Sequence, residues 1–332
     1  MKNHDVYGIG HALVDTELVV PDQFLTEMKL EKGTMALVDQ ARQEELLAAA
    51  QGYEQKRSCG GSAANTVIGV AQFGGRGFHS CKVADDEAGR FFAEDMLKNG
   101  VDNELAAHLS PGVTGRCLVF ITPDAERTMC THLGISETFS TDDLVESTLK
   151  NSQYLYIEGY LVTADATRLA ALEAARLARQ HGVKIALTFS DPNIVKFFRD
   201  GLMEMVGEGV DLLFCNAQEA INFSGCNDPD EAREALKKHA KAQVITLGAQ
   251  GAALFDGQNS LNLPGRSVTA IDTNGAGDAF AGAFLYAVSN GFSFENAGKL
   301  AIEASSLLVT QYGARLSQGQ AQGIITSFEE HV

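Results

Sequence analysis

The feature that most constrains the fold is a regular alternation of strand-length apolar runs and helix-length amphipathic runs, which begins near residue 151. An apolar run at 154–157 precedes an alanine-rich segment with helical spacing at 165–180, and Gly182 ends that segment before a second apolar run at 183–189. The same order continues toward the C-terminus, with strands expected at 210–214 and 243–247 and helices at 217–222, 230–241, 279–288 and 296–311. Alternation of this kind predicts a doubly wound α/β fold, in which a mainly parallel sheet carries helices on both faces.

The first third of the chain follows a different pattern. Segments 13–20 and 115–121 have the composition of strands, but helices do not separate them at regular intervals. We therefore expect them to form a small separate sheet that covers part of the main domain. Helices expected at 40–51, 63–73 and 87–99 are assigned to the main domain. No repeat or proline-rich linker divides the 332 residues, so we expect one domain with an excursion.

Composition excludes several classes of protein. Hydrophobic residues make up 45% of the chain and charged residues 21%, which suits a soluble globular protein with a substantial core. The formal net charge of −17 would repel nucleic acid, and no apolar run approaches the ~18 residues of a membrane helix. Six cysteines without a CxxC pair, and an N-terminus without the apolar core of a signal peptide, indicate reduced thiols in the cytoplasm.

The segment DTNGAGDAF at 272–280 places small residues and a carboxylate directly before an apolar helix. Gly275, Ala276 and Gly277 would leave backbone N–H groups accessible, and the following helix adds the positive end of its dipole, so the segment suits an anion such as a phosphate. A carboxylate beside a phosphate is repelled unless it has a chemical role, and Asp278 could accept the proton of an attacking hydroxyl during phosphoryl transfer. The alternative is structural, with Asp278 as a helix cap and the glycines in a tight turn.

A second glycine pair precedes the helix expected at 63–73. Gly60 and Gly61 would allow a ligand to approach the backbone, and Asn65 offers both a donor and an acceptor, which suits the vicinal hydroxyls of a sugar. An ordinary helix N-terminus explains these residues equally well.

Two further segments follow strands at the edge where open α/β sheets bind ligands. Asn216 and Glu219 come directly after the strand at 210–214 with i, i+3 spacing, and such a pair could hold the water shell of Mg²⁺ against phosphates. The same NxxE pair is also a common capping arrangement. The segment TLGAQG at 246–251 would let a nucleotide lie against the backbone, or would form a hairpin turn.

Other nucleotide and metal sites are not supported by the sequence. It contains no GxxxxGK[ST] phosphate loop, and GIGHAL near the N-terminus lacks the third glycine of a dinucleotide fingerprint. The eight histidines form no HExxH or other metal spacing.

Together these segments resemble a known family. DTNGAGDAF is similar to the second signature of the ribokinase-like, or PfkB, carbohydrate and nucleoside kinases, and GGSAAN at 60–65 is similar to the first. The resemblance covers nearly the whole chain and implies one ribokinase-like α/β domain over 1–332, with a small β-sheet lid formed by excursions at about 13–38 and 112–133. It also implies ATP as phosphoryl donor, Mg²⁺, and a primary hydroxyl of a sugar or nucleoside as acceptor.

The resemblance further implies a role for each candidate residue. Asp278 is expected to be the catalytic base, with the backbone of residues 275–277 as the anion hole, and Asp272 is similar to the carboxylate of a monovalent-cation (K⁺) site. The residues expected to hold the hydroxyls of the acceptor are Asp15, Gly60, Gly61 and Asn65. Those expected at ATP are Asn216, Thr246, Gly248 and Gly251, with Glu219 holding Mg²⁺ through water. Basic candidates for lining the triphosphate are Arg116, Arg127 and Lys299.

Within the family, GHALVDTEL, LYIEGYLVT and IDTNGAGDAF look like segments of adenosine kinases, which implies transfer to the 5'-hydroxyl of adenosine or a related nucleoside. Those kinases set aromatic side chains against the purine near the positions of Leu161 and Asn193, and Tyr160 could substitute. The alternatives are a kinase of ribose, fructose or a keto-sugar acid, and a non-catalytic nucleotide or sugar sensor. We expect a small-molecule partner, no nucleic acid, no membrane, and a monomer or homodimer.

Overall fold

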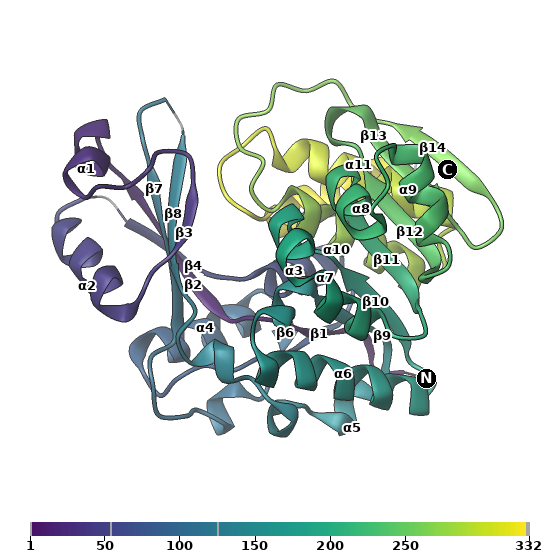
Figure 1. Ribbon diagram of the computed structural model, residues 1–332, viewed down its shortest axis with the longest axis horizontal. Helices are drawn as coiled ribbons and strands as arrows, with labels where there is room; N and C mark the ends of the chain where they lie inside the picture. The colour runs from purple at the N-terminus through teal and green to yellow at the C-terminus, as the bar shows by residue number, and fades with distance from the viewer. Residues whose placement is uncertain (1, 54, 125, 330–332) are drawn as a thin grey trace.

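The computed structural model describes residues 2–53, 55–124 and 126–329, and it shows a large α/β unit beside a smaller sheet with two helices of its own (Figure 1). The strands of the large sheet are β1 His4–Ile9, β5 Gly77–Ser80, β6 Val101–Asp102, β9 Ser152–Glu158, β10 Lys184–Thr188, β11 Val210–Asn216, β12 Ala240–Thr246, β13 Gly251–Phe255 and β14 Ser260–Pro264. Their order is β14-β13-β12-β11-β10-β9-β1-β5-β6. All pairs from β6 to β12 are parallel, whereas β13 and β14 are antiparallel, which confirms the predicted mainly parallel, doubly wound sheet.

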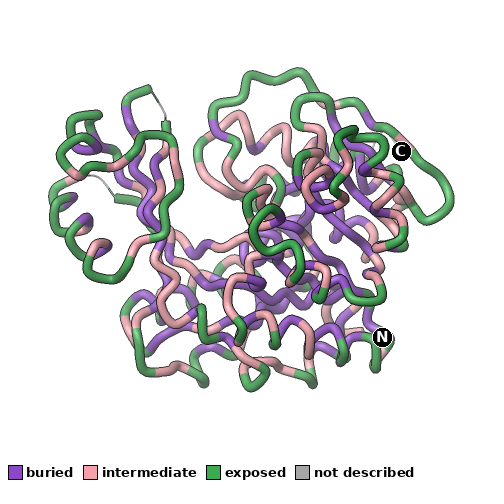
Figure 2. Tube along the Cα trace, in the orientation of Figure 1, coloured by how far each residue is buried: buried purple, intermediate pink, exposed green. Residues whose placement is uncertain are grey.

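Helices cover both faces of this sheet, and each face has its own buried core. Figure 2 shows that buried residues are concentrated in the interior of the large unit. The helices that bury apolar residues on one face are α3 Ser62–Gln72, α4 Glu87–Lys98, α10 Ala276–Ser289, α11 Phe294–Leu308 and α12 Gln318–Glu329. Those on the other face are α5 Glu146–Leu149, α6 Asp165–Gln180, α7 Pro192–Val206, α8 Ala217–Ser224 and α9 Pro229–Leu236. No helix in the described parts of the chain is long and apolar enough to cross a bilayer.

The smaller sheet, with its two helices, is called the lid here. Its strands are β2 Leu13–Val19, β3 Met35–Leu37, β4 Gln55–Gly60, β7 Gly115–Ile121 and β8 Arg127–His132, in the order β3-β8-β7-β2-β4. Helices α1 Asp22–Glu27 and α2 Gln40–Ala49 pack on one face of this sheet around Leu18, Phe24, Leu46 and Phe120, which are all buried. The other face turns toward the large unit (Figure 1).

One predicted helix is assigned to the wrong unit, and β4 and α7 are among the elements that were not predicted. The helix expected at 40–51 is wrong in its placement, because Leu46 of α2 is buried in the lid core and not in the main domain. Strand β4 was not predicted, since Gln55, Lys56 and Arg57 are exposed and polar and carry no apolar alternation. Helix α7 was also missed, although its buried residues Val195, Leu202, Met205 and Val206 recur with helical spacing; its backbone is non-helical at Phe198, and Phe197 is 69% exposed.

The aromatic cluster beneath α10 provides a test of the fold. Phe284 is fully buried and packs edge-on against Phe214 and Phe294, at 5.6 and 4.9 Å between ring centroids. We expect Phe284→Ala to lower the free energy of unfolding by ~3–5 kcal/mol, because the truncation leaves a cavity in a packed core. Urea denaturation measures this, with the exposed Phe197→Ala as a control that should stay within about 0.5 kcal/mol of the wild type. Equal losses in both variants would contradict the packing.

Candidate active site

The inner face of the lid and the carboxyl edge of the large sheet enclose a cavity of about 420 Å³. Apolar side chains of the lid line one side, and the polar starts of α3 and α10 line the other. The predicted site residues that share this cavity are Asp15, Gly61, Asn65, Gly275, Ala276, Gly277 and Asp278. Residues more than 200 positions apart in sequence therefore meet at one place, as the predicted carboxyl-edge site requires.

Asp278 lies in the first turn of α10, where its carboxylate accepts hydrogen bonds from α3. Ser62 Oγ donates to Oδ1 at 2.6 Å, and Asn65 Nδ2 donates to Oδ2 at 3.2 Å. Burial raises the pKa of Asp278 to about 6, although both hydrogen bonds act to lower it. Such a carboxyl group is ionised at neutral pH and still basic enough to accept a proton in a transition state. The arrangement suits a general base.

The backbone before Asp278 forms the N-terminus of α10. Gly275 has φ +73°, and a Cβ there would lie 2.4 Å from the carbonyl oxygen of Ala314, so glycine is required. The Ala276 N–H already donates to the Thr273 carbonyl at 3.2 Å. First-turn amides of a helix have no acceptor within the helix, so the N–H groups of Gly277 and Asp278 are the better candidates for holding an anion.

Polar groups suited to hydroxyls line the same cavity from two sides, from lid strand β2 and from helix α3. A Cβ on Gly60 would lie 2.2 Å from Oδ2 of Asp15, so the absent side chain leaves room for that carboxylate. Burial raises the pKa of Asp15 to about 7, while the charge of Arg315 opposes the rise. Oδ1 of Asn65 is buried and has no hydrogen-bond partner among the described residues. A hydroxyl donor from a ligand would satisfy it.

Glu158 is a site residue that sequence reasoning missed. It lies at the end of β9, is 1% exposed, and accepts hydrogen bonds from the backbone N–H groups of His11 (2.7 Å) and Ala63 (2.8 Å). Burial raises its pKa to about 7, against the effect of these two hydrogen bonds. It ties the start of α3 to the segment before β2. The signal was present, because a carboxylate directly follows the apolar run at 154–157.

The two positions discussed for a purine base do not face the cavity. Leu161 is fully buried in the core behind the sheet, and Asn193 is exposed and lies outside the cavity lining. Tyr160 does line the cavity, and it is the one Tyr or Phe among the described residues that do so. The lid contributes aliphatic and thioether side chains instead: Leu13, Met35, Leu37, Val119, Met129 and Leu133.

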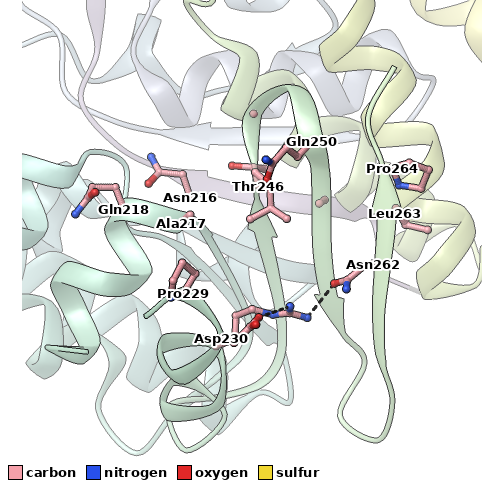
Figure 3. Close-up of a pocket in the computed structure, with 14 residues that line it drawn as sticks. Asn216, Ala217, Gln218, Pro229, Asp230, Thr246, Gln250, Asn262, Leu263 and Pro264 are labelled. Atoms are coloured by element: carbon pink, nitrogen blue, oxygen red, sulfur yellow. Dashed lines mark hydrogen bonds and ion pairs between the residues drawn. The ribbon is translucent and has the colours of Figure 1, made fainter. Parts of the chain in front are cut away.

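A second hollow of about 340 Å³ adjoins the first at Ala276 and Gly277. It is lined by Thr246, Gly248 and Gly251, the residues that the sequence analysis expects at ATP. Arg266 is the basic residue of its lining. A third hollow of about 810 Å³ lies beside the same turn and contains Asn216 together with Thr246 and Gly248 (Figure 3). Its charged residues Arg233 and Asp230 are paired with each other at 3.1 Å.

Asn216 and Glu219 form the capping arrangement that was the structural alternative. Oδ1 of Asn216 accepts from the Glu219 N–H at 2.8 Å, while the Glu219 oxygens accept from the N–H and Nδ2 of Asn216 at 3.0 and 2.6 Å. Glu219 is 4% exposed, and burial raises its pKa to about 7. A role toward Mg²⁺ stays a prediction.

Asp272 already has a cation as its partner. Its Oδ2 lies 2.8 Å from Nη2 of Arg127, a lid residue. Arg116 and Lys299 pair instead with Asp86 and Glu295, and neither lines the three hollows. Within the described chain, no group of three or more His, Cys, Asp or Glu side chains could hold a metal ion. A monovalent cation at Asp272 stays a prediction.

Comparisons with known proteins show the family to which this chain belongs. The model of the pfkB family of carbohydrate kinases matches residues 35–320. Aminoimidazole riboside kinase of Salmonella typhimurium is 32% identical over 248 residues, which cover 72% of this chain and 76% of that protein. The solved structure of adenosine kinase from Sinorhizobium meliloti is 34% identical with a TM-score of 0.87, and that of a probable sugar kinase from Rhizobium etli is 31% identical with a TM-score of 0.89. Both alignments cover 98% of this chain and 99% of the other.

The two glycines before Asp278 form a matched pair for testing the anion-holding turn. We expect Gly275→Ala to lower the free energy of unfolding by ~1–3 kcal/mol, because the new Cβ meets the Ala314 carbonyl at a positive φ. Gly277→Ala meets no atom within 4 Å and should not lower it. Thermal or urea unfolding of both variants measures the difference. A harmless Gly275→Ala would contradict this geometry.

The raised pKa of Asp278 predicts an acidic limit to catalysis. Protonation removes the base, so kcat/KM should fall about tenfold for each pH unit below a pKa of about 6. A carboxyl group at its ordinary pKa of ~3.9 would retain the base form two units further down. Initial rates from pH 4.5 upward, roughly spanning this window, test the effect. Values of kcat/KM that stay level down to the lowest pH measured would mean that Asp278 is not the titrating base.

Proposed function

The chain belongs to the pfkB family of carbohydrate kinases, phosphotransferases with an alcohol group as acceptor, and we propose that it uses ATP and Mg²⁺ to phosphorylate the 5'-hydroxyl of adenosine or a related nucleoside. One observation carries the proposal. Asp278 lines the cavity between the lid and the large sheet, which is called the acceptor cavity from here on. It lies next to Gly277, where that cavity and the second hollow meet. A hydroxyl bound on one side and a phosphate on the other would both reach the start of α10.

The chemistry assigned to the chain is limited to positioning, charge and one proton. Asp15 and Oδ1 of Asn65 would hold the hydroxyls of the acceptor. Asp278 would take the proton of the attacking hydroxyl. The oxygen of that hydroxyl bonds to the γ-phosphorus, while the bond from phosphorus to the leaving ADP oxygen breaks. The N–H groups at the start of α10 would face the charge on the transferred group. Enclosure by the lid would exclude water, which is a competing acceptor.

Asn216 and Glu219 fit an indirect role toward Mg²⁺. Both oxygens of Glu219 already accept hydrogen bonds from Asn216, so direct ligation would break the capping box. Mg²⁺ commonly keeps several waters and is held by substrate phosphates, so this pair would orient its water shell. When bound with ATP, the ion would neutralise phosphate charge.

The shape of the acceptor cavity supports a nucleoside over a free sugar. Its lid side is apolar over Met35, Leu37, Val119 and Met129, which suits a flat base more than a pentose alone. Tyr160 is the one Tyr or Phe ring available for stacking among the described lining residues. The absence of aromatic contacts from positions 161 and 193 keeps a sugar acceptor as the second candidate.

We expect Asp278→Asn to reduce turnover by ~10²- to 10⁴-fold with the fold intact, because the general base is lost. Asp228→Asn is the matched control, since Asp228 caps α9 away from the cavity and Asn caps equally well. The assay is ADP release with ATP and Mg²⁺ on adenosine, inosine, ribose and fructose.

Turnover on adenosine that disappears in Asp278→Asn supports the proposal. Turnover on a free sugar alone would keep the mechanism and discard the nucleoside. Binding of ATP and acceptor without any product would indicate a sensor. Unchanged turnover in Asp278→Asn would refute the role of Asp278.

A further inference from the structure

One lid arginine reaches across to the main domain beside the site. Arg127 begins β8, and its side chain is 9% exposed. Its Nη2 lies 2.8 Å from Oδ2 of Asp272, its Nη1 lies 3.4 Å from Glu17, and its guanidinium stands 5.7 Å from the ring centre of Tyr312. A lid cation is therefore buried against a main-domain carboxylate whose side chain is 5% exposed.

Asp272 shapes the turn that leads into α10. Its Oδ1 accepts the Asn274 N–H at 3.0 Å and its Oδ2 accepts the Gly313 N–H at 2.9 Å. One carboxylate thus joins the segment 272–275 to the segment 313–314, against which Gly275 packs without room for a Cβ. A buried carboxylate without a cation is strongly destabilised, so the charge of Arg127 helps to keep this junction in place.

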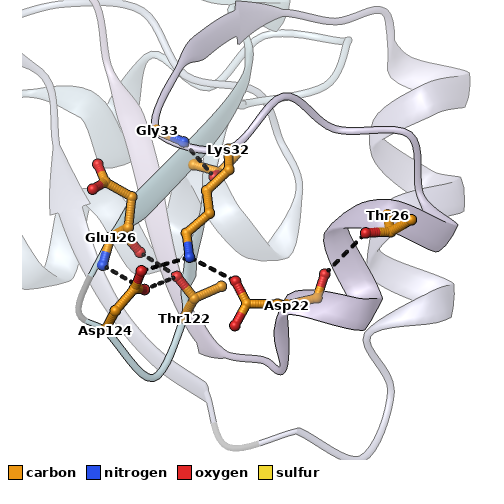
Figure 4. A network of polar contacts seen from close by, with 8 residues as sticks. Asp22, Thr26, Lys32, Gly33, Thr122, Asp124 and Glu126 are labelled. Carbon is orange, nitrogen blue, oxygen red and sulfur yellow. Dashed lines mark hydrogen bonds and ion pairs between the residues drawn. The ribbon is translucent and has the colours of Figure 1, made fainter.

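Residues that shortly precede Arg127 in the chain are held within the lid by a network of polar contacts (Figure 4). Lys32 donates to Asp22 and to Asp124, both at 2.6 Å. Thr122 Oγ1 donates to Oδ1 of Asp124 at 2.7 Å, and the Thr122 N–H donates to the Glu126 carbonyl at 3.0 Å. Asp124, three residues before Arg127, is therefore linked through Lys32 to Asp22 of α1.

We propose that Arg127 is a positioning residue that acts through Asp272. By bringing a cation from the lid to that carboxylate, it couples the position of the lid to the shape of the anion-holding start of α10. Phosphate would then meet a correctly formed turn only while the lid lies against the main domain. The inference rests on the proposed function only in requiring that α10 receive a phosphate group.

Direct contact of Arg127 with the transferred phosphate is the competing account. Nε and Nη2 of Arg127 are buried and have no hydrogen-bond acceptor among the described residues, since the contact with Asp272 is an ion pair and not a linear hydrogen bond. The two accounts differ in one respect. Action through Asp272 makes the effects of Arg127 and Asp272 overlap, whereas direct contact makes them independent.

The test is a double-mutant cycle with Arg127→Gln, Asp272→Asn and the double variant in the full chain. We expect each single variant to lower kcat about 10- to 100-fold through misplacement of the turn, and the double variant to be no worse than the poorer single. Arg57→Gln is the control, because Arg57 also joins the lid to the main domain, at 2.8 Å from Glu87 and outside the cavity lining. It should keep kcat within about twofold, as expected for an exposed ion pair.

Losses that multiply in the double variant, or an Asp272→Asn variant with full kcat, would overturn the proposal. If Arg127→Gln does not fold, Arg127→Lys replaces it in the cycle, since it keeps the charge and loses the guanidinium fork. Dissociation constants of Mg-ADP for the same four proteins repeat the cycle without any acceptor. If the wild-type protein is inactive on adenosine, only the proposed acceptor is refuted. If the losses of Mg-ADP affinity in the two single variants add up in the double variant, the proposed coupling is refuted.

Discussion

The close crossing of α3 and α10 is the constraint on which the site depends. A Cβ on Gly282 would lie 2.7 Å from the Thr66 carbonyl, and one on Gly69 would lie 3.4 Å from the Cα of Gly282, so the two helices meet at backbone distance. Because the helices touch there, their N-termini converge and Ser62 reaches Asp278 at 2.6 Å. Two positive helix ends then point at one place, which favours an ionised carboxylate and a bound phosphate.

Burial, more than hydrogen bonding, sets the acidity of this cavity. Asp15, Glu158 and Asp278 all line it, and burial raises the pKa of each to between about 6 and about 7 although every one has partners that lower it. Mutual repulsion adds to the rise, because the charge of Asp278 raises the pKa of both other groups. Three carboxyl groups that titrate near neutrality suit a site that binds hydroxyls and moves a proton.

Local patterns predicted the alternating elements of the main domain and the lid strands β2 and β7, and they missed β4 and α7. The alternation after residue 151 predicted α6 at its observed bounds, because its alanines 170, 174 and 178 form a continuous buried stripe. An amphipathic pattern does not say which surface a helix covers, so α2 was assigned to the wrong unit. Asp278 and Gly275 could be predicted as site residues because glycines and a carboxylate directly before an apolar helix suit an anion site. The Arg127–Asp272 pair depends on lid placement, which no local pattern contains.

The exposed apolar residues of the lid bear on what the cavity accepts. Met35 and Leu37 on β3 are 50% and 66% exposed, yet both line the acceptor cavity. Burying apolar surface contributes roughly 25 cal/mol per Å², so a ligand with a flat apolar face gains from covering these side chains. A nucleobase offers such a face and a free pentose does not. A ligand that covers these side chains would also keep the lid against the main domain, where Arg127 contacts Asp272. The acceptor that best fills the lid would therefore also best stabilise the turn that receives the phosphate.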